Sequence, residues 1–184
     1  MRKYLLLITF IAIIVLAVFL AFFTAEKEVF IDDLKAEAKT NFELESPDFR
    51  YGEPIPATFT CDSSNEPPTL RWRGQPEGTV TYVLLMYDPD APGGTFIHWV
   101  VYDIPGSVTE YQPGVGVNGL NHFGRKGYGG PCPPPGSTHR YFFVLFALDT
   151  KLNLSEGARL SDVLRAAKGH VLAVAETMGR YGRS

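Results

Sequence analysis

The stretch from Thr81 to Tyr102 reads TYVLLMYDPDAPGGTFIHWVVY and decides the fold. Its two outer parts, Thr81–Tyr87 and Phe96–Tyr102, are dense in β-branched and aromatic residues, which favour strands. Both parts are apolar on both faces, so they are predicted to be central strands of a sheet that is covered on both sides. The residues between them, Asp88–Gly94, are rich in Pro and Gly and predict a turn-rich loop.

The rest of the chain adds shorter elements to this sheet. Tyr141–Leu148 (YFFVLFAL) predicts another central strand, and Ala57–Thr60 predicts a short one. Ser161–Lys168 predicts a short helix that is capped by its first residue and stopped at Gly169. The apolar period of His170–Met178 fits either a helix or a strand.

The charge of the chain gives no support to nucleic-acid binding. There are 17 Lys and Arg against 20 Asp and Glu in 184 residues, so the formal net charge is −3. A run or stripe of basic residues is the usual footprint of a nucleic-acid-binding protein, and the sequence contains none.

The first residues predict a membrane anchor. Tyr4–Phe23 carries no charge and is almost wholly apolar, and about 20 such residues span the hydrocarbon core of a bilayer as a helix. Arg2 and Lys3 precede it, so the N-terminus is expected in the cytoplasm and the rest of the chain outside. Without these two residues the chain carries a net −5, which disfavours adhesion to anionic lipid by charge alone.

A cleaved signal peptide is the alternative for this segment. Its apolar region should be shorter, and small residues should precede the cleavage site at alternate positions. Cleavage after Ala25 or Ala21 would place Phe23 or Phe19 at such a position, so the uncleaved anchor is favoured. The expected organisation is an anchor over residues 1–24, a stalk with a possible short helix over 25–41, and one domain over 42–184.

Four polar side chains stand out beside the apolar strands. Asp88 ends the first central strand, His98 lies inside the second, and His139 and Tyr141 begin the third. A buried carboxylate or imidazole is costly unless it is paired, and a shared pocket would pair all four. Each also has a structural explanation: a strand histidine is commonly a core or rim residue, and Asp88 before Pro89 could cap a turn.

Two long motifs resemble the signatures of the phosphatidylethanolamine-binding protein family. They are DPDAPGGTFIHWVVYDIPG, from Asp88 to Gly106, and GYGGPCPPPGSTHRYFFVLFALD, from Gly127 to Asp149. CDSSNEPPTLRW at 61–72 and GHVLAVAETMGRY at 169–181 are similar to the bacterial and archaeal branch, often called Raf kinase inhibitor-like. The resemblance covers most of the chain after about Phe42.

The resemblance implies a mainly β single domain with a large central antiparallel sheet, a smaller sheet and a few short helices. It also makes a strand the favoured form of 170–178. In the family a pocket binds phosphate, acetate and phospholipid head groups. The residues of this chain that match the pocket motifs are Asp88, His98, Gly130, Pro131, His139 and Tyr141. The chain departs from the family pattern at Cys61–Ser63 and at His122, outside these motifs.

The chemistry of these residues suits an anion. Protonated imidazoles donate hydrogen bonds from both nitrogens, Asp88 can orient one ring, and Tyr141 offers a hydroxyl. Gly130 is expected to let a ligand approach the backbone, and the prolines after it to stiffen the wall. A phosphate or phospholipid head group is therefore the expected ligand, with no cofactor, and the protein is expected to be a binding protein rather than an enzyme.

Other functions stay open at this point. Cys132 served by His139 could be a nucleophile, although no third orienting group is evident. Asp88, His98 and His139 could form a metal site of a hydrolase, although no paired metal-ligand spacing supports it. The family also includes inhibitors of kinases and of serine proteases, so a regulatory role outside the cytoplasm is a further possibility, with its protein target unknown.

The two cysteines are the last open question. Cys61 and Cys132 form an even pair in an expected oxidising compartment, so they could form a disulfide. Two buried free thiols are the alternative, because a sequence does not show whether the residues meet.

Overall fold

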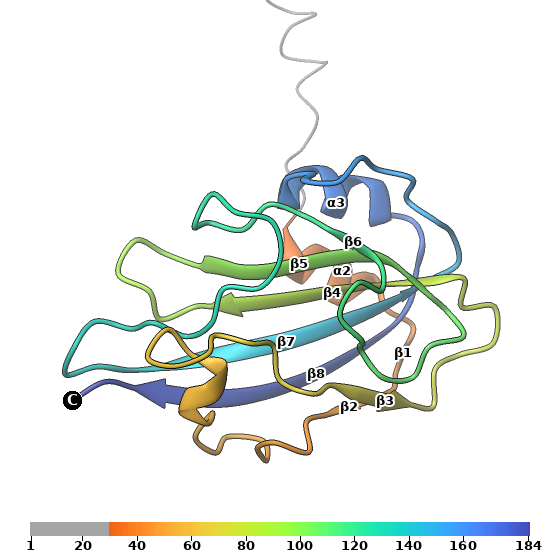
Figure 1. Cartoon of the computed structure of the whole chain (residues 1–184). Helices are drawn as coiled ribbons and strands as arrows, with labels where there is room; N and C mark the ends of the chain where they lie inside the picture. Colours follow the sequence, from red (N-terminus) through yellow and green to blue (C-terminus); the bar gives the residue numbers. More distant parts are fainter. Residues whose placement is uncertain (1–29) are drawn as a thin grey trace, which may run out of the picture.

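The computed structural model describes residues 30–184. A six-stranded sheet forms its centre, with two helices on one face and a two-stranded sheet on the other (Figure 1). In spatial order the strands of the large sheet are β1 (Thr40–Asn41), β8 (Val171–Gly182), β7 (Thr138–Leu148), β4 (Thr81–Asp88), β5 (Phe96–Pro105) and β6 (Val117–Asn118). The small sheet pairs β2 (Glu43–Glu45) with β3 (Arg71–Arg73).

The large sheet is mixed and not purely antiparallel, which corrects one expectation. The pairs β4–β5, β4–β7, β7–β8 and β5–β6 are antiparallel, but the edge strand β1 runs parallel to β8. The chain enters β1 from helix α2 (Ile31–Glu37), which packs against β8. This entry from a helix at the sheet edge sets the direction of β1.

The central strands are buried on both faces, as their sequences predict. Alternate residues of β4 enter two separate cores: Leu84 and Met86 face the small sheet, whereas Val83 and Leu85 face the helices. Burial of such side chains contributes about 1.5–3 kcal/mol each, so this sheet is the main source of stability.

Helix α2 belongs to the folded body. It lies within the segment 25–41 that was expected to be a stalk, but its Leu34 is completely buried and contacts the core below the helices. The described part of that segment, residues 30–41, therefore packs onto the sheet instead of standing apart from it.

Two local expectations were wrong and one was right. Residues Ala57–Phe59 form a single 3₁₀ turn rather than a strand, because the Thr60 amide bonds back to the Ala57 carbonyl. Helix α3 (Leu160–Ala167) begins before Ser161, so that residue is not its cap. The ambiguous segment after Gly169 is strand β8.

The predicted anchor at residues 1–24 lies outside the described residues. Between residues 30 and 184, no helix is long and apolar enough to cross a membrane.

Candidate functional site

Asp88 and His139 meet where β4 ends and β7 begins. His139 Nδ1 lies 2.7 Å from Asp88 Oδ2, and both side chains are less than a tenth exposed. The other Asp88 oxygen accepts the backbone N–H of Asp90 at 2.8 Å. Because a carboxylate only accepts, the hydrogen of His139 is on Nδ1, and its Nε2 forms no hydrogen bond within residues 30–184.

A β-bulge brings His98 to the same side of the sheet. Met86 pairs with Trp99 but Tyr87 pairs with Ile97, so His98 is an extra residue in β5. Ile97 faces the helices, whereas Trp99 belongs to the core on the other face. Without the bulge, His98 and Trp99 would point to opposite faces.

His98 is held by the loop before β7. Its Nδ1 lies 2.6 Å from the Gly129 carbonyl, so Nδ1 carries the hydrogen and donates it. Burial lowers the pKa of His98 below its usual 6.5, although the Gly129 carbonyl and the Asp88 carboxylate oppose the shift. The ring is therefore neutral at neutral pH, and Nε2 is an acceptor there.

Tyr141 completes the group and holds an unused hydroxyl. Its ring is fully buried and lies edge-on to His98 with 5.2 Å between ring centroids. By its geometry the hydroxyl makes no hydrogen bond with a described residue, although the backbone N–H of Cys132 lies near its oxygen. Burial, and next the Asp88 carboxylate, raise the pKa of Tyr141, with the Cys132 backbone opposing them, so the group stays a neutral donor.

Gly130 and Pro131 lie next to the Gly129 carbonyl that holds His98, and both contact the segment around Cys61. A Cβ on Gly130 would lie 2.3 Å from the Phe59 carbonyl, and its amide donates to Asn65 Oδ1 at 2.8 Å. Its missing side chain thus makes room for the 3₁₀ turn and the loop that follows it. The Pro131 carbonyl accepts the amide of Cys61 in the same loop.

The two cysteines fasten these loops together. Cys61 and Cys132 form a disulfide, with 5.4 Å between their Cα atoms. Beyond Cys61, the carboxylate of Asp62 accepts the hydroxyl of Tyr181 at 2.7 Å and pairs with Arg183 at 3.0 Å. The wall of the site is thereby tied to β8. Cys132 is not a free thiol in this structure, which removes the support for a cysteine nucleophile.

Aromatic rings cover His98, and the sequence reading missed them. The ring centroids of Phe96 and Phe123 lie 5.1 and 5.3 Å from that of His98. The Phe123 side chain is still 37% exposed. The missing side chain of Gly129 lets Phe123 lie there, because a Cβ would come within 2.5 Å of that ring. The sequence signal that could have indicated this contact is the pair Gly129–Gly130, which follows Phe123 in the same loop. Phe123 is thus the outermost part of the cover.

The loop between β4 and β5 is fixed to β7 at the rim. Arg140 makes two side-chain hydrogen bonds and one backbone hydrogen bond to the carboxylate of Asp90. These bonds lower the pKa of Asp90 to about 2. The loop carrying Asp88 therefore keeps its position across the ordinary pH range.

The arrangement does not resemble a metal centre. In the part of the chain that the structure describes, no group of three or more His, Cys, Asp or Glu side chains is placed to hold a metal ion.

The comparisons with known proteins decide the family. Residues 45–182 match the family model described as phosphatidylethanolamine-binding protein. The chain belongs to the phosphatidylethanolamine-binding protein family. This confirms the resemblance of the two signatures, and membership implies binding of a ligand.

Relatives in the bacterial and archaeal branch are similar over most of their length. A protein named UPF0098 protein from Aquifex aeolicus is 49% identical over 151 residues, which are 77% of this chain and 88% of that protein. A protein of the same name from Methanothermobacter thermautotrophicus is 46% identical over 138 residues, which are 70% of this chain and 91% of that protein.

Two solved structures share the fold of this phosphatidylethanolamine-binding protein family member. The crystal structure of a Chlamydia trachomatis homologue of the family has a TM-score of 0.74 and 37% identity. That of E. coli YbcL, described as a new member of the mammalian family, has a TM-score of 0.73 and 32% identity. Each match includes 79% of this chain and the whole of the matched structure.

Proposed function

We propose that this protein binds a small phosphate-like anion, such as a phospholipid head group, between Asp88, His98, His139 and Tyr141, without catalysing a reaction. The Tyr141 hydroxyl is the observation that carries the proposal, because a buried donor without a partner costs about 1–3 kcal/mol. A ligand oxygen would supply the missing acceptor.

The two imidazoles offer complementary contacts for such a ligand. Asp88 accepts the Nδ1–H of His139 and so orients the ring, which leaves Nε2 available to a ligand oxygen. His98 accepts at Nε2 while it is neutral, so it suits a protonated phosphate oxygen, and it donates there after gaining a proton. In this proposal Gly130 and Pro131 bound the space, which is supported by their hydrogen bonds to the loop that carries Cys61.

We expect weak binding of phosphate that depends on both histidines. In calorimetric titrations with inorganic phosphate and phosphoethanolamine, His98→Ala and His139→Ala should each lose about 1–3 kcal/mol, the scale of a charge-assisted hydrogen bond. His122→Ala is the control, because His122 lies outside the group of four and should cost little. Loss of binding in the control alone, with both pocket variants unaffected, would place the site elsewhere.

Binding is expected to strengthen as the pH falls through and below about 6.5. The free protein holds His98 neutral because burial lowers its pKa, whereas a bound anion favours the protonated ring. One proton is then taken up with the ligand, so affinity rises by at most about tenfold per pH unit. Titrations in buffers of different ionisation enthalpy count this proton, and His98→Gln should abolish the uptake. An affinity independent of pH contradicts the role of His98.

The lowered pKa of His98 also determines whether the stability of the protein rises or falls with pH. Below about 6.5 the unfolded chain binds a proton at His98 that the folded chain refuses, so the unliganded protein loses stability as pH falls toward the folded pKa. Phosphate should offset this loss by raising that pKa.

A hydrolase or metal-dependent enzyme using Asp88, His98 and His139 is the second candidate. The described residues give it little support, since the three groups form no metal cluster and Cys132 is bonded to Cys61. A regulator or protease inhibitor on the outer side of the membrane is compatible with the anion site, which would then sense a head group or an acidic residue of its target.

We propose further that residues 1–24 anchor the chain and that the domain lies outside the cytoplasm. Arg2 and Lys3 precede the apolar run, which supports this direction of insertion. A reporter that is active only outside the cytoplasm should work when fused after Ser184. Exchange of Arg2 and Lys3 for glutamate should reduce its activity. Activity of a cytoplasm-only reporter at Ser184 would reverse the topology.

A further inference from the structure

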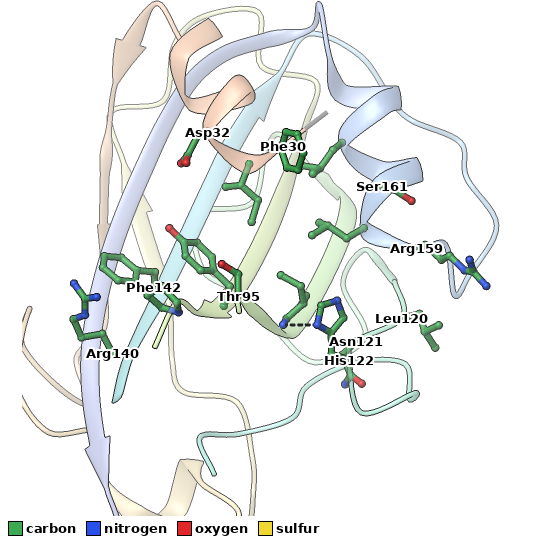
Figure 2. A pocket seen from close by; sticks show the side chains of 16 residues that line it. Phe30, Asp32, Thr95, Leu120, Asn121, His122, Arg140, Phe142, Arg159 and Ser161 are labelled. Carbon is green, nitrogen blue, oxygen red and sulfur yellow. Dashed lines mark hydrogen bonds between the residues drawn. The ribbon is translucent and has the colours of Figure 1, made fainter. Parts of the chain in front are cut away.

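A second hollow lies on the opposite face of the large sheet from Asp88 and His98. It has a volume of about 890 Å³, which is within the range of small-molecule sites, about 300–1,000 Å³. Its floor is the sheet, and α2, α3 and the loop at residues 120–122 surround it (Figure 2). Ile97, Phe142 and Leu164 on this floor and wall belong to the core that packs under the helices.

The lining leaves apolar surface incompletely covered. Ile31, Tyr87, Leu120, Phe142 and Leu160 line the hollow and are only partly buried, although such side chains are favoured inside. Phe30 at the mouth is 57% exposed. An apolar chain lying against these residues would remove this surface from water, at about 25 cal/mol per Å².

Hydrogen-bond donors gather at the end beside α3. His122 Nδ1 accepts the backbone N–H of Ile97 at 3.2 Å, so its hydrogen is on Nε2 (Figure 2). Burial lowers the pKa of His122, which keeps the ring neutral with Nε2 as a donor. Ser161 and Arg159 stand at the start of α3, and the long Arg159 side chain extends along the outer edge. Its guanidinium makes no ion pair with another described residue and can turn over the mouth.

Away from α3, the other charged side chains of the lining supply no free cation, because Asp32 is a carboxylate and Arg140 is paired. Arg140 lines the hollow there, but Asp90 occupies its guanidinium. The unpaired positive charge is thus confined to the α3 end, which gives the hollow an apolar body and one cationic end.

We propose that this hollow binds a single-chain amphiphilic anion, a long-chain fatty acid. Its hydrocarbon chain lies on Ile97, Phe142 and Leu164, and its carboxylate accepts from His122 Nε2 and from Arg159. Arg is suited to this task because its planar fork can bind both oxygens of a carboxylate.

The start of the described chain indicates the source of such a ligand. Phe30 lines the hollow, and only six residues, 24–29, separate it from the end of the apolar run at Phe23. A chain of that length reaches at most about 25 Å. With the membrane anchor proposed above, on which this step rests, the mouth stays within that distance of the lipid surface, where fatty acids reside.

Photolabelling of the full chain in phosphatidylcholine vesicles tests the proposal. A palmitate analogue with a diazirine on its chain should label peptides that contain residues 95–97, 120–122 and 160–164, and excess palmitate should suppress the label. Thr95 is exposed and lies between Phe142 and His122 in Figure 2, so Thr95→Trp fills the hollow without disturbing buried packing. We expect it to weaken labelling about tenfold, whereas Thr95→Ser should not.

The head group is tested on α3 itself. Arg159→Gln should reduce labelling at low palmitate, and Lys168→Gln, which removes an exposed charge at the other end of the same helix, should not. Label confined to residues 1–29, equal label in Thr95→Trp, or stronger competition by lysophosphatidylcholine than by palmitate would each overturn the proposal. His98→Ala separates the two sites: it should weaken phosphate binding and leave the photolabelling unchanged.

Discussion

Replacing both Cys61 and Cys132 with serine is expected to lower the free energy of unfolding by about 4 kcal/mol. The disulfide closes a loop over a separation of 71 residues, and a loop of that size removes about 4 kcal/mol of chain entropy from the unfolded state. The loss is a large share of the stability of a domain, about 5–15 kcal/mol.

Urea unfolding of the oxidised protein, the reduced protein and the double serine variant measures this effect. Reduction and substitution should give the same loss, because both open the same loop. Thiol counting in denaturant without reductant should find no free thiol in the native protein. Two free thiols per chain, or an unchanged unfolding midpoint, would show that the cysteines do not form the bond.

The loss of the bond should also reach the proposed anion site. Cys61 and the Pro131 carbonyl join the same two loops, and the amide of Gly130 binds Asn65 across them. With the disulfide open, these hydrogen bonds alone hold the wall, so phosphate affinity should fall even under conditions where the variant is fully folded. Asp62→Asn, which weakens the tie to Arg183 but keeps the disulfide, should have a smaller effect.

The fold was predictable from the sequence where local pattern and burial agree. The runs that became β4, β5 and β7 are apolar on both faces, and only a covered central strand satisfies that pattern. The parallel pairing of β1 with β8 was not predictable, because two residues carry no pattern and their partner lies far along the chain. The burial of Leu34 was missed for a similar reason: a short amphipathic helix does not say what its apolar side packs against.

The candidate site was predictable as a set of residues but not as a geometry. Asp88 and His139 could be named from motifs, and their contact follows from the pairing of β4 with β7. The bulge at His98 and the filling of the Gly130 position by the Phe59 carbonyl depend on contacts between distant loops. No local period encodes such contacts, so the packing of Gly130 against the Phe59 carbonyl could not be predicted from the sequence.

Removal of the Asp88 carboxylate should cost about 3 kcal/mol of stability. Asp88→Ala leaves the Nδ1–H of His139 without an acceptor in a place that is less than a tenth exposed, and it frees the amide of Asp90. Breaking one side of a buried pair is costly, since the remaining group keeps its burial and loses its partner. Thermal and urea unfolding give the change in stability.

The chain offers a matched control on its surface. His170 Nδ1 lies 2.7 Å from Asp149 Oδ1, the same distance as in the buried pair, but both side chains are almost half exposed. Water can replace the lost carboxylate there, so Asp149→Ala should cost less than about 1 kcal/mol. Equal losses at the two positions would show that burial does not set the energy of the Asp88 pair.

A double substitution separates folding from binding at this pair. Asp88→Leu with His139→Phe removes both polar groups and keeps apolar volume, so it should be less destabilising than Asp88→Leu alone, by about 1–3 kcal/mol. Phosphate binding should nevertheless be lost in the double variant, because the His139 ring that contacts the ligand is gone. A double variant as stable as the wild type would show that stability does not require the pair, whereas a double variant far less stable than the wild type would show that it does. Wild-type stability together with lost phosphate binding in the double variant would therefore support a role of Asp88 and His139 in binding the ligand.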